Sequence, residues 1–323
     1  MDNDTNDTME PSPQPIALDH TEIATLDLLD PQGVDWSRVR RTAYLVHQSY
    51  RYEYPGPIRD LRQRLIIVPP ARFGDQRRVL HRLEVSVPDH SIIEEQDAFG
   101  NTVVTVRVPS VERAILFEAW IVVERTNGQE PQRLPVAALT DPRFLTPSRL
   151  TEPDDLLRAA AAELAAANAG AGGLALAERI NAWVYRAMRY AHEVTDIHTT
   201  AAAALAGGRG VCQDYAHIML ALCRLCGLPA RYVSGHLLGE GGTHAWVDVL
   251  VPAGDDPDAA VAVPFDPLHD RRATLRYVTV AIGRDYDDVA PTSGAYVADY
   301  AGRLSARKHV GITAVDYAPA LGG

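Results

Sequence analysis

The chain of 323 residues has few cysteines, no long apolar run and a single lysine, and each scarcity excludes some classes of protein. Only three cysteines are present, which argues against a disulfide framework and for a reducing compartment, so we expect a cytoplasmic protein. No apolar run approaches the roughly 18 residues that a membrane helix needs. The N-terminus lacks the basic and apolar regions of a signal peptide. We therefore expect no membrane partner.

Lysine is also scarce, and the 31 basic residues are outnumbered by 42 acidic ones. The formal net charge is −11, and Lys308 is the only lysine. A nucleic-acid partner has no electrostatic support, because binding to phosphates relies on basic surface. The use of arginine in place of lysine, with abundant alanine, is a hint of a GC-rich bacterial genome. A hydrophobic fraction of 46% and a charged fraction of 23% are typical of a globular protein, and the length suggests two domains.

The most informative stretch begins with a glycine-rich turn that leads into Cys212. Apolar residues after it recur at three- and four-residue steps, as in a helix: Val211, Tyr215, Ile218, Leu222 and Leu225. Cys212 is therefore expected in the first turn of a buried helix. Unpaired backbone N–H groups and the helix dipole at that position favour the thiolate, which is the nucleophilic form.

A histidine and an aspartate follow in a different setting. Residues 243–252 are rich in valine and predict a buried strand, and residues 260–265 predict a second one. The turn chemistry of residues 253–258 joins them as an antiparallel hairpin. His244 then lies near the start of one arm and Asp266 near the end of the other, so the two are expected side by side. A Cys–His–Asp set of this kind is a general arrangement for an activated thiol.

Other candidate residues have simpler interpretations. Cys223 and Cys226 form a C-x-x-C inside an apparent helix end, and no second cysteine pair completes a zinc site, so we expect them in the core and predict no metal or cofactor. His217 follows Cys212 by five residues and lies off its helix face, which favours a packing role. Asp214 is expected to satisfy backbone donors in the first turn.

The rest of the chain predicts three segments. Residues 1–30 are polar and acidic, and we expect a disordered tail. Residues 31–140 contain short alternating strands separated by turns, which favours a β-sandwich domain. Residues 141–323 form the third segment, with helices over 156–167, 174–190 and 199–205 before the Cys212 helix, a strand over 274–282 after the hairpin, and weaker strand patterns at the C-terminus.

Four sequence segments together carry a resemblance to a known family. They are Gly-Val-Cys-Gln-Asp-Tyr-Ala-His, Pro-Ala-Arg-Tyr-Val-Ser-Gly, His-Ala-Trp and Phe-Asp-Pro, in this order. They resemble the core of the bacterial transglutaminase-like superfamily, which is similar to papain-type cysteine hydrolases. Residues 283–291 are similar to a recurrent segment of these proteins. The strand region from about residue 44 resembles the β accessory domain that often precedes this core.

The resemblance implies an α+β fold: an N-terminal β-sandwich-like domain and a papain-like core of helices packed on an antiparallel sheet. It implies that Cys212 is the nucleophile, His244 the general base and acid, and Asp266 the orienting carboxylate. The chain departs from the family after Asp266, where Leu-His stands in place of a frequent Thr-Asn, and it lacks a common Gly-Trp before the aspartate. These departures leave the triad intact and put substrate preference in doubt.

The expected chemistry is attack of the Cys212 thiolate on a peptide or carboxamide carbonyl, which gives a thioester. The Cys212 backbone N–H is one candidate donor to the oxyanion, and Gln213, Trp246 or upstream amides are candidates for the second. Tyr286 either contacts substrate or belongs to a surface loop. Water as the acceptor makes the protein a peptidase or amidase, which we favour because nothing marks an amine site. An amine makes it a transglutaminase, and a non-catalytic binding module is the third alternative. Each enzyme acts on a peptide or protein substrate.

Overall fold

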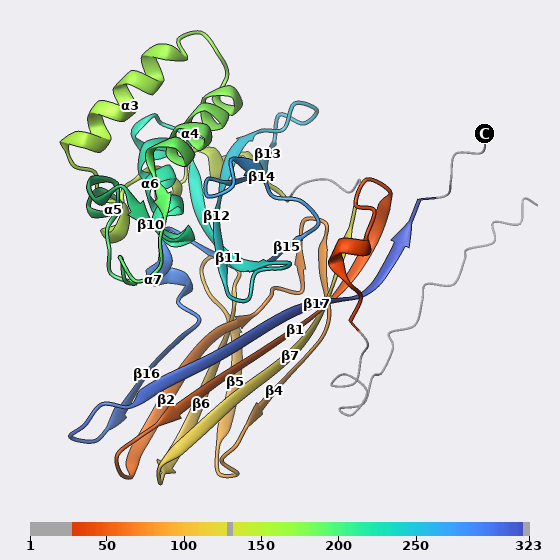
Figure 1. Cartoon of the computed structure of the whole chain (residues 1–323), viewed down its shortest axis with the longest axis vertical. Coiled ribbons are helices and arrows are strands. Elements are labelled where there is room, and N and C mark those ends of the chain that lie inside the picture. The colour runs from red at the N-terminus through yellow and green to blue at the C-terminus, as the bar shows by residue number, and fades with distance from the viewer. Residues whose placement is uncertain (1–27, 128–131, 319–323) are drawn as a thin grey trace, which may run out of the picture.

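The computed structural model describes residues 28–127 and 132–318 of the chain. The acidic tail predicted over residues 1–30 lies outside the described residues, apart from its last three. Figure 1 shows long strands that lie below a compact group of helices and shorter strands. No helix in the described part is long and apolar enough to cross a membrane.

The long strands form two antiparallel sheets that enclose an apolar interior. One sheet has the order β17-β1-β7-β4-β3 and the other β16-β2-β6-β5. Alternation along β1 places Tyr44, Val46 and Tyr50 in the interior, against Phe117 and Ile121 of β7. The strands of the two sheets are β1 (Val39–Glu53), β2 (Ile58–Val68), β3 (Arg72–Phe73), β4 (Gln76–Val85), β5 (Ser91–Gln96), β6 (Thr102–Val111), β7 (Ala114–Thr126), β16 (Thr292–Val297) and β17 (Arg303–Tyr317).

The two C-terminal strands belong to these sheets by hydrogen bonding. β17 pairs antiparallel with β1 along nearly its whole length, and β16 pairs with β2. We predicted both strands as part of the core segment 141–323. Their weak alternation did not reveal a partner, because strand pairing over such a separation depends on the fold and not on local pattern.

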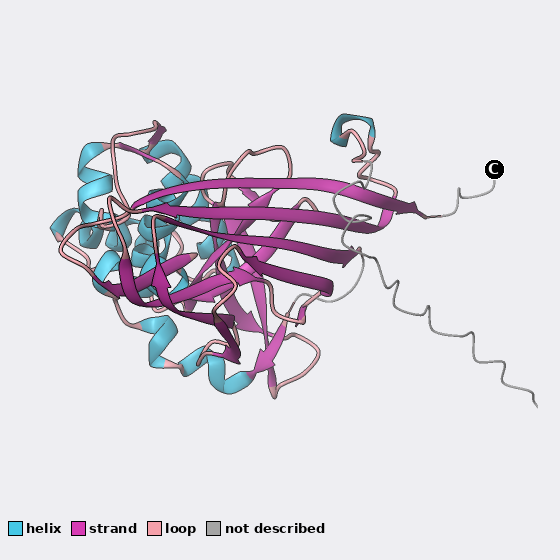
Figure 2. Ribbon diagram, turned by 90° about the horizontal axis from the view of Figure 1, so that it is seen from below, coloured by secondary structure: helices cyan, strands magenta, loops and turns pink. Residues whose placement is uncertain are grey.

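The second part of the molecule is an antiparallel sheet with helices packed on it. Its strand order is β14-β13-β12-β11-β15, and β8 adds to β13. Figure 2 shows the longer helices gathered at one end of the long strands. The strands are β8 (Arg133–Pro135), β11 (Ala230–Leu237), β12 (His244–Pro252), β13 (Ala259–Asp266), β14 (Arg271–Arg272) and β15 (Tyr277–Gly283), and the longer helices are α3 (Asp155–Ala167), α4 (Gly173–Ala187), α5 (Ala201–Gly207) and α6 (Cys212–Leu225).

Helix α6 lies at the centre of this part. It packs against α3, α4 and α5 on one side and against β11 and β12 on the other. Its residues from Gln213 to Arg224 are buried all round, as expected of a helix enclosed on every face. The free energy gained by burying Ile218, Met219 and Leu222 therefore fixes the helix whose first residue is Cys212.

Short elements connect these parts. They are a two-stranded parallel pair, β9 (Arg189–Tyr190) and β10 (Arg209–Gly210), the helices α2 (Pro142–Leu145) and α7 (Tyr286–Val289), and 3-10 turns at Pro31–Gly33, Val136–Thr140 and Arg149–Thr151. The predicted helix over 174–190 ends earlier, at Ala187. The backbone becomes extended at Met188, and Arg189 N–H donates to Gly208 O at 3.0 Å. The mixed α and β class, with mostly antiparallel sheets, is confirmed.

Candidate active site

Cys212 is the first residue of α6, and its side chain is partly exposed. The turn before it is held by Asp214, whose Oδ2 accepts from Val211 N–H at 2.8 Å and from Thr195 Oγ1 at 2.7 Å. Gly210 packs against the same carboxylate, so a Cβ there would collide with it. The glycine-rich turn thus lets the buried Asp214 side chain close the start of the helix.

His244 and Asp266 meet at the open end of the β12–β13 hairpin. His244 begins β12, Asp266 ends β13, and the pairing of Val247 with Phe265 places them at adjacent ends. His244 Nε2 donates to Asp266 Oδ2 at 2.8 Å, and both residues are fully buried. Removal from water strengthens such a charge-assisted contact and fixes the ring orientation.

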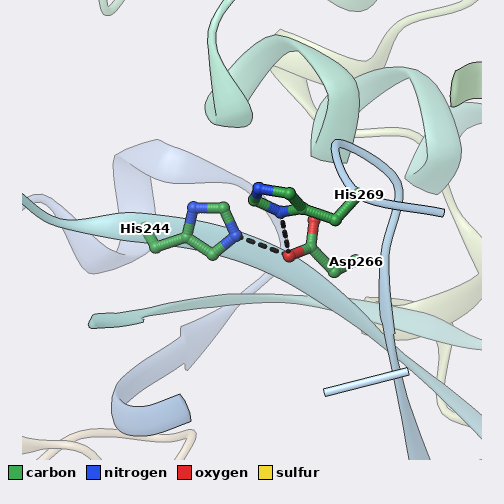
Figure 3. A group of neighbouring side chains, drawn as sticks. All are labelled: His244, Asp266 and His269. Atoms are coloured by element: carbon green, nitrogen blue, oxygen red, sulfur yellow. Dashed lines mark hydrogen bonds and ion pairs between the residues drawn. The ribbon is translucent and has the colours of Figure 1, made fainter. Parts of the chain in front are cut away.

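Asp266 is held by more than one donor. Its Oδ2 also accepts from His269 Nδ1 at 2.8 Å and from Tyr277 OH at 2.6 Å, while Oδ1 accepts from Leu268 N–H at 3.0 Å. Figure 3 shows the His244 and His269 rings directed at the same oxygen. Burial alone would raise the pKa of Asp266, but the hydrogen bonds from His244 and His269 outweigh it and hold that pKa below its usual range. The carboxylate is therefore an anion that orients both rings.

The other nitrogen of His244 faces a second carboxylate. Nδ1 lies 3.1 Å from Glu240 Oε2, which is an ion pair when the ring is protonated. Burial alone would lower the pKa of His244, but the hydrogen bond with Asp266, the nearby Cys212 thiol and Glu240 raise it above its ordinary value. At neutral pH the ring is therefore mainly the imidazolium, which is the form that pairs with a thiolate.

His269 and Glu240 form a second ion pair over the site. His269 Nε2 lies 3.3 Å from Glu240 Oε1, so each ring nitrogen of His269 faces a carboxylate. Asp266 first and then Glu240 raise the pKa of His269 to about 9. Burial would raise the pKa of Glu240, but His244 and His269 lower it to about 2. At neutral pH the pair is ionic and holds Glu240, and with it the β11–β12 loop, close to His244.

A cavity of about 1130 Å³ opens beside these groups. Cys212, Glu240, Thr243 and His269 line it, with Tyr185 and Tyr190 exposed at its edge. Its volume is sufficient for several residues of an extended peptide. The geometry therefore combines a thiol, a base with an oriented carboxylate, and room for a substrate.

The three tentative site residues lie in different places. Gln213 is mostly buried, and its side-chain nitrogen donates to Asp196 O at 3.4 Å. Trp246 stacks on His244, with ring centroids 6.2 Å apart, and lines a separate cavity. Tyr286 begins α7, and its backbone N–H donates to His217 Nε2 at 3.2 Å. None of the three lines the cavity that Cys212 lines.

The two remaining cysteines and His217 are packed away from the cavity. Cys223 is fully buried, and Cys226 is partly buried, with its thiol 3.6 Å from Ala161 O. Burial raises the pKa of both thiols. Burial also lowers the pKa of His217 to about 3, so this ring is neutral and accepts the Tyr286 N–H.

His244, Asp266 and His269 also satisfy the spacing of a metal site. Their ligand atoms lie within 4.8 Å of one another. However, Asp266 Oδ2 already accepts from both rings and from Tyr277, so these donors satisfy it without an ion. A metal there would have to displace both ring N–H groups from the carboxylate.

Sequence reasoning missed several residues of the site: His269, Glu240 and Tyr277. His269 follows Asp266 by three residues in a turn, and this spacing was noted only as a departure from a family pattern. Glu240 stands in the glycine-rich loop before His244. Tyr277 comes from β15, two strands away from β12 in the sheet, and no local signal could have placed it beside Asp266.

Comparison with known proteins agrees with this architecture. Residues 158–266 match the family model of the transglutaminase-like superfamily, and residues 44–124 match that of the bacterial transglutaminase-like N-terminal region. An uncharacterized protein of Mycobacterium leprae is 30% identical over 273 residues, which cover 78% of this chain and 92% of that protein. An uncharacterized protein of Mycobacterium tuberculosis is 36% identical over 122 residues, covering 34% of this chain and 38% of that protein. The chain belongs to the transglutaminase-like superfamily.

A solved structure shares the fold. It is that of a proposed cysteine protease from Cytophaga hutchinsonii, with a TM-score of 0.66 and 23% identity, and the match covers 87% of this chain and 94% of that one. At this level of identity the likeness concerns the architecture. The predicted combination of an accessory β region and a transglutaminase-like core is therefore confirmed as a family assignment.

Proposed function

We propose that the protein is a cysteine-dependent acyl hydrolase that cleaves peptide or carboxamide bonds. The observation that carries the proposal is the buried hydrogen bond of 2.8 Å between His244 Nε2 and Asp266 Oδ2, beside a large cavity that Cys212 lines. This is the relation between base and orienting group that activates a thiol nucleophile in general.

In this mechanism the proton of Cys212 resides on His244, so the site rests as a thiolate–imidazolium pair. The thiolate attacks the acyl carbon, and the carbonyl π electrons move to oxygen. Collapse of the tetrahedral species expels the amine, which receives the proton from His244, and leaves a thioester on Cys212. Water then attacks the thioester with His244 as base, releasing the acid and the free thiol.

Stabilisation of the oxyanion is expected from the start of α6. The Cys212 N–H is not needed by the helix, because the first N–H groups of a helix have no partner within it. The dipole of this helix also favours negative charge at that end. Asp266 keeps the His244 ring in place while its charge changes.

Hydrolysis and amine transfer begin with the same thioester, so they are separated by product analysis. A glutamine-containing peptide library is incubated with and without a labelled primary amine. Free acid and ammonia indicate hydrolysis, whereas incorporation of the label indicates a transglutaminase. We expect hydrolysis, since water is present in an open cavity and no described residue marks a separate amine site.

The matched control is Cys212→Ala, which removes one sulfur from a partly exposed position and should fold normally. Turnover should fall by at least a thousandfold, because the variant has no nucleophile. If the variant turns over as fast as the wild type, the activity has another origin. If neither protein turns over any acyl donor and Cys212 resists alkylation, the chain is a binding module with this fold.

A further inference from the structure

The only lysine of the chain contacts Thr243, in the loop that precedes His244, although it belongs to the N-terminal sheet. Lys308 is in β17, opposite Gln48 of β1, so its side chain shares the inner face of the sheet with Gln48 and Tyr50. Nζ lies 5.5 Å from the centre of the Tyr50 ring and donates to Thr243 Oγ1 at 3.4 Å. Thr243 precedes His244 and lines the cavity that holds Cys212.

Lys308 has no anionic partner in the described part of the chain. No carboxylate of residues 28–127 and 132–318 comes within 4.0 Å of Nζ. Burial lowers the pKa of Lys308 to about 8, while the charge of nearby Cys212 acts in the opposite direction. Lys308 is therefore mostly a cation at pH 7, partly buried beside Thr243 and without a carboxylate partner, and such a group gains from an anion.

Apart from Cys212, the neighbouring side chains do not supply that anion. Burial lowers the pKa of His236, the imidazole close to Lys308, to about 4, so it is neutral. Glu240 is the carboxylate of the cavity lining, and it is held by His269 and His244. Arg186 and Arg189 also line the cavity. The cleft is thus cationic within a protein whose net charge is −11.

We propose that Lys308 binds a carboxylate of the acyl donor next to Cys212, and that the N-terminal sheet thereby selects acidic substrates. The proposal rests on the proposed function for its substrate, but Lys308 also favours anions at Cys212 without turnover. The carboxylate belongs either to an acidic side chain or to a free C-terminus, which share the same recognition chemistry.

The first test compares two alkylators of nearly equal size, anionic iodoacetate and neutral iodoacetamide. The rate of each reagent is measured at Cys212 by peptide mass analysis. The iodoacetate rate is divided by the iodoacetamide rate, and this ratio is compared with the same ratio for free N-acetylcysteine. We expect the wild-type ratio to exceed that of the free thiol by roughly five- to tenfold, the size of one poorly screened charge interaction. A wild-type ratio at or below that of the free thiol overturns the proposal, whatever the variants do.

The variants assign this preference to Lys308. Lys308→Met should remove most of it by slowing iodoacetate alone, and Lys308→Arg should keep it. Arg307→Met is the matched control, because it removes the same charge from the adjacent, exposed position of β17, whose side chain points to the opposite face. Equal slowing of both reagents in Lys308→Met, or an equal loss of the ratio in Arg307→Met, contradicts carboxylate binding by Lys308.

The second test uses acyl donors. Peptides with Glu or Gln beside the cleaved bond, each with a free or amidated C-terminus, are compared in wild type and Lys308→Met. A raised KM limited to the Glu peptides assigns a side-chain carboxylate, and one limited to free C-termini assigns a terminal carboxylate. An equal effect on all four peptides contradicts the proposal. Absence of turnover in the wild type counts against the proposed function, while the alkylation ratio still decides the role of Lys308.

Discussion

At the scale of single residues, the site depends on how many donors one carboxylate oxygen can satisfy. Asp266 Oδ2 accepts from His244, His269 and Tyr277. The first contact orients the base, and the other two fix the carboxylate itself. An orienting residue held in this way can keep its position while the ring beside it gains and loses a proton.

The three cysteines should differ in reactivity toward a neutral alkylator. Cys212 lines the cavity beside a basic imidazole, whereas burial raises the pKa of Cys223 and Cys226. We expect Cys212 to be labelled at least tenfold faster than either at pH 7, since the thiolate is the reactive form. Time-resolved peptide mass analysis measures the three rates. A slower rate at Cys212 than at the buried Cys223 would contradict an activated thiol.

His269 should make the folded state depend on pH. Its pKa is raised to about 9 in the fold, so its stabilisation is fully present below the unfolded value of about 6.5 and is lost as the pH rises through 9. After allowance for solvent screening of this half-exposed ring, we expect about 1 kcal/mol. The free energy of unfolding is measured by urea titration at pH 6 and pH 9.5.

His269→Gln is the comparison for that experiment. It keeps a polar side chain but cannot carry the charge, so the part of the pH dependence due to His269 should disappear. His244 shares Asp266 and Glu240 with His269, so the difference between the two proteins reports His269 together with its coupling to His244. An identical change in unfolding free energy for wild type and His269→Gln would show that the ion pairs with Asp266 and Glu240 add nothing to stability.

At the scale of elements, the core sheet determines where His244 lies. Gly235 of β11 leaves no room for a Cβ, which would meet Val278 O and the Trp246 ring. The Trp246 ring, which stacks on His244, occupies the space next to Gly235. The strands can therefore approach closely at this position only because the residue is a glycine. The sheet and the base are therefore linked through one position without a side chain.

Gly235→Ala should disturb both stability and the site. We expect a loss of about 2–3 kcal/mol in the free energy of unfolding, because a backbone oxygen and a buried ring must move. Gly254→Ala is the control: it lies in the β12–β13 turn with nothing within 4 Å of its Cβ, so its effect should stay within about 0.5 kcal/mol. Equal melting temperatures for the two variants would refute the close approach.

The sequence predicted those parts of the site that local pattern encodes. The apolar spacing after Cys212 gave the helix, and two valine-rich runs around a polar turn gave the hairpin, so the positions of Cys212, His244 and Asp266 within their elements followed. Tyr277 and Lys308 come from β15 and β17, and their approach depends on sheet order and on long-range pairing. Neither sheet order nor long-range pairing can be read from the neighbouring residues, so the sequence did not reveal the approach of Tyr277 and Lys308 to the site.

At the scale of the whole molecule, the N-terminal sheets depend on the C-terminal strands. β17 covers the edge of β1 and β16 covers the edge of β2. A chain ended after Ala290 would leave both edges unpaired and would uncover apolar residues that pack near them, such as Tyr54. Unpaired edges of long strands are templates for association with other chains.

We therefore expect the chain ended after Ala290 to associate and to melt at a lower temperature, even though it keeps Cys212, His244 and Asp266. Light scattering and a thermal melt followed by circular dichroism measure these outcomes. A monomeric protein with an unchanged melting temperature would indicate that the N-terminal sheets are stable without β16 and β17.

The pairing of β17 with β1 also has a consequence for synthesis on the ribosome. Residues 39–53 are made first, and their partner follows only after all of the thiol-bearing core has been translated. The nascent polypeptide can thus assemble Cys212, His244 and Asp266 while one edge of β1 is still unpaired. Lys308 is the last of these residues to be translated, so the proposed preference for acidic peptides is acquired only when β17 pairs with β1. A chain that stalls before that point would carry a reactive Cys212 without this preference.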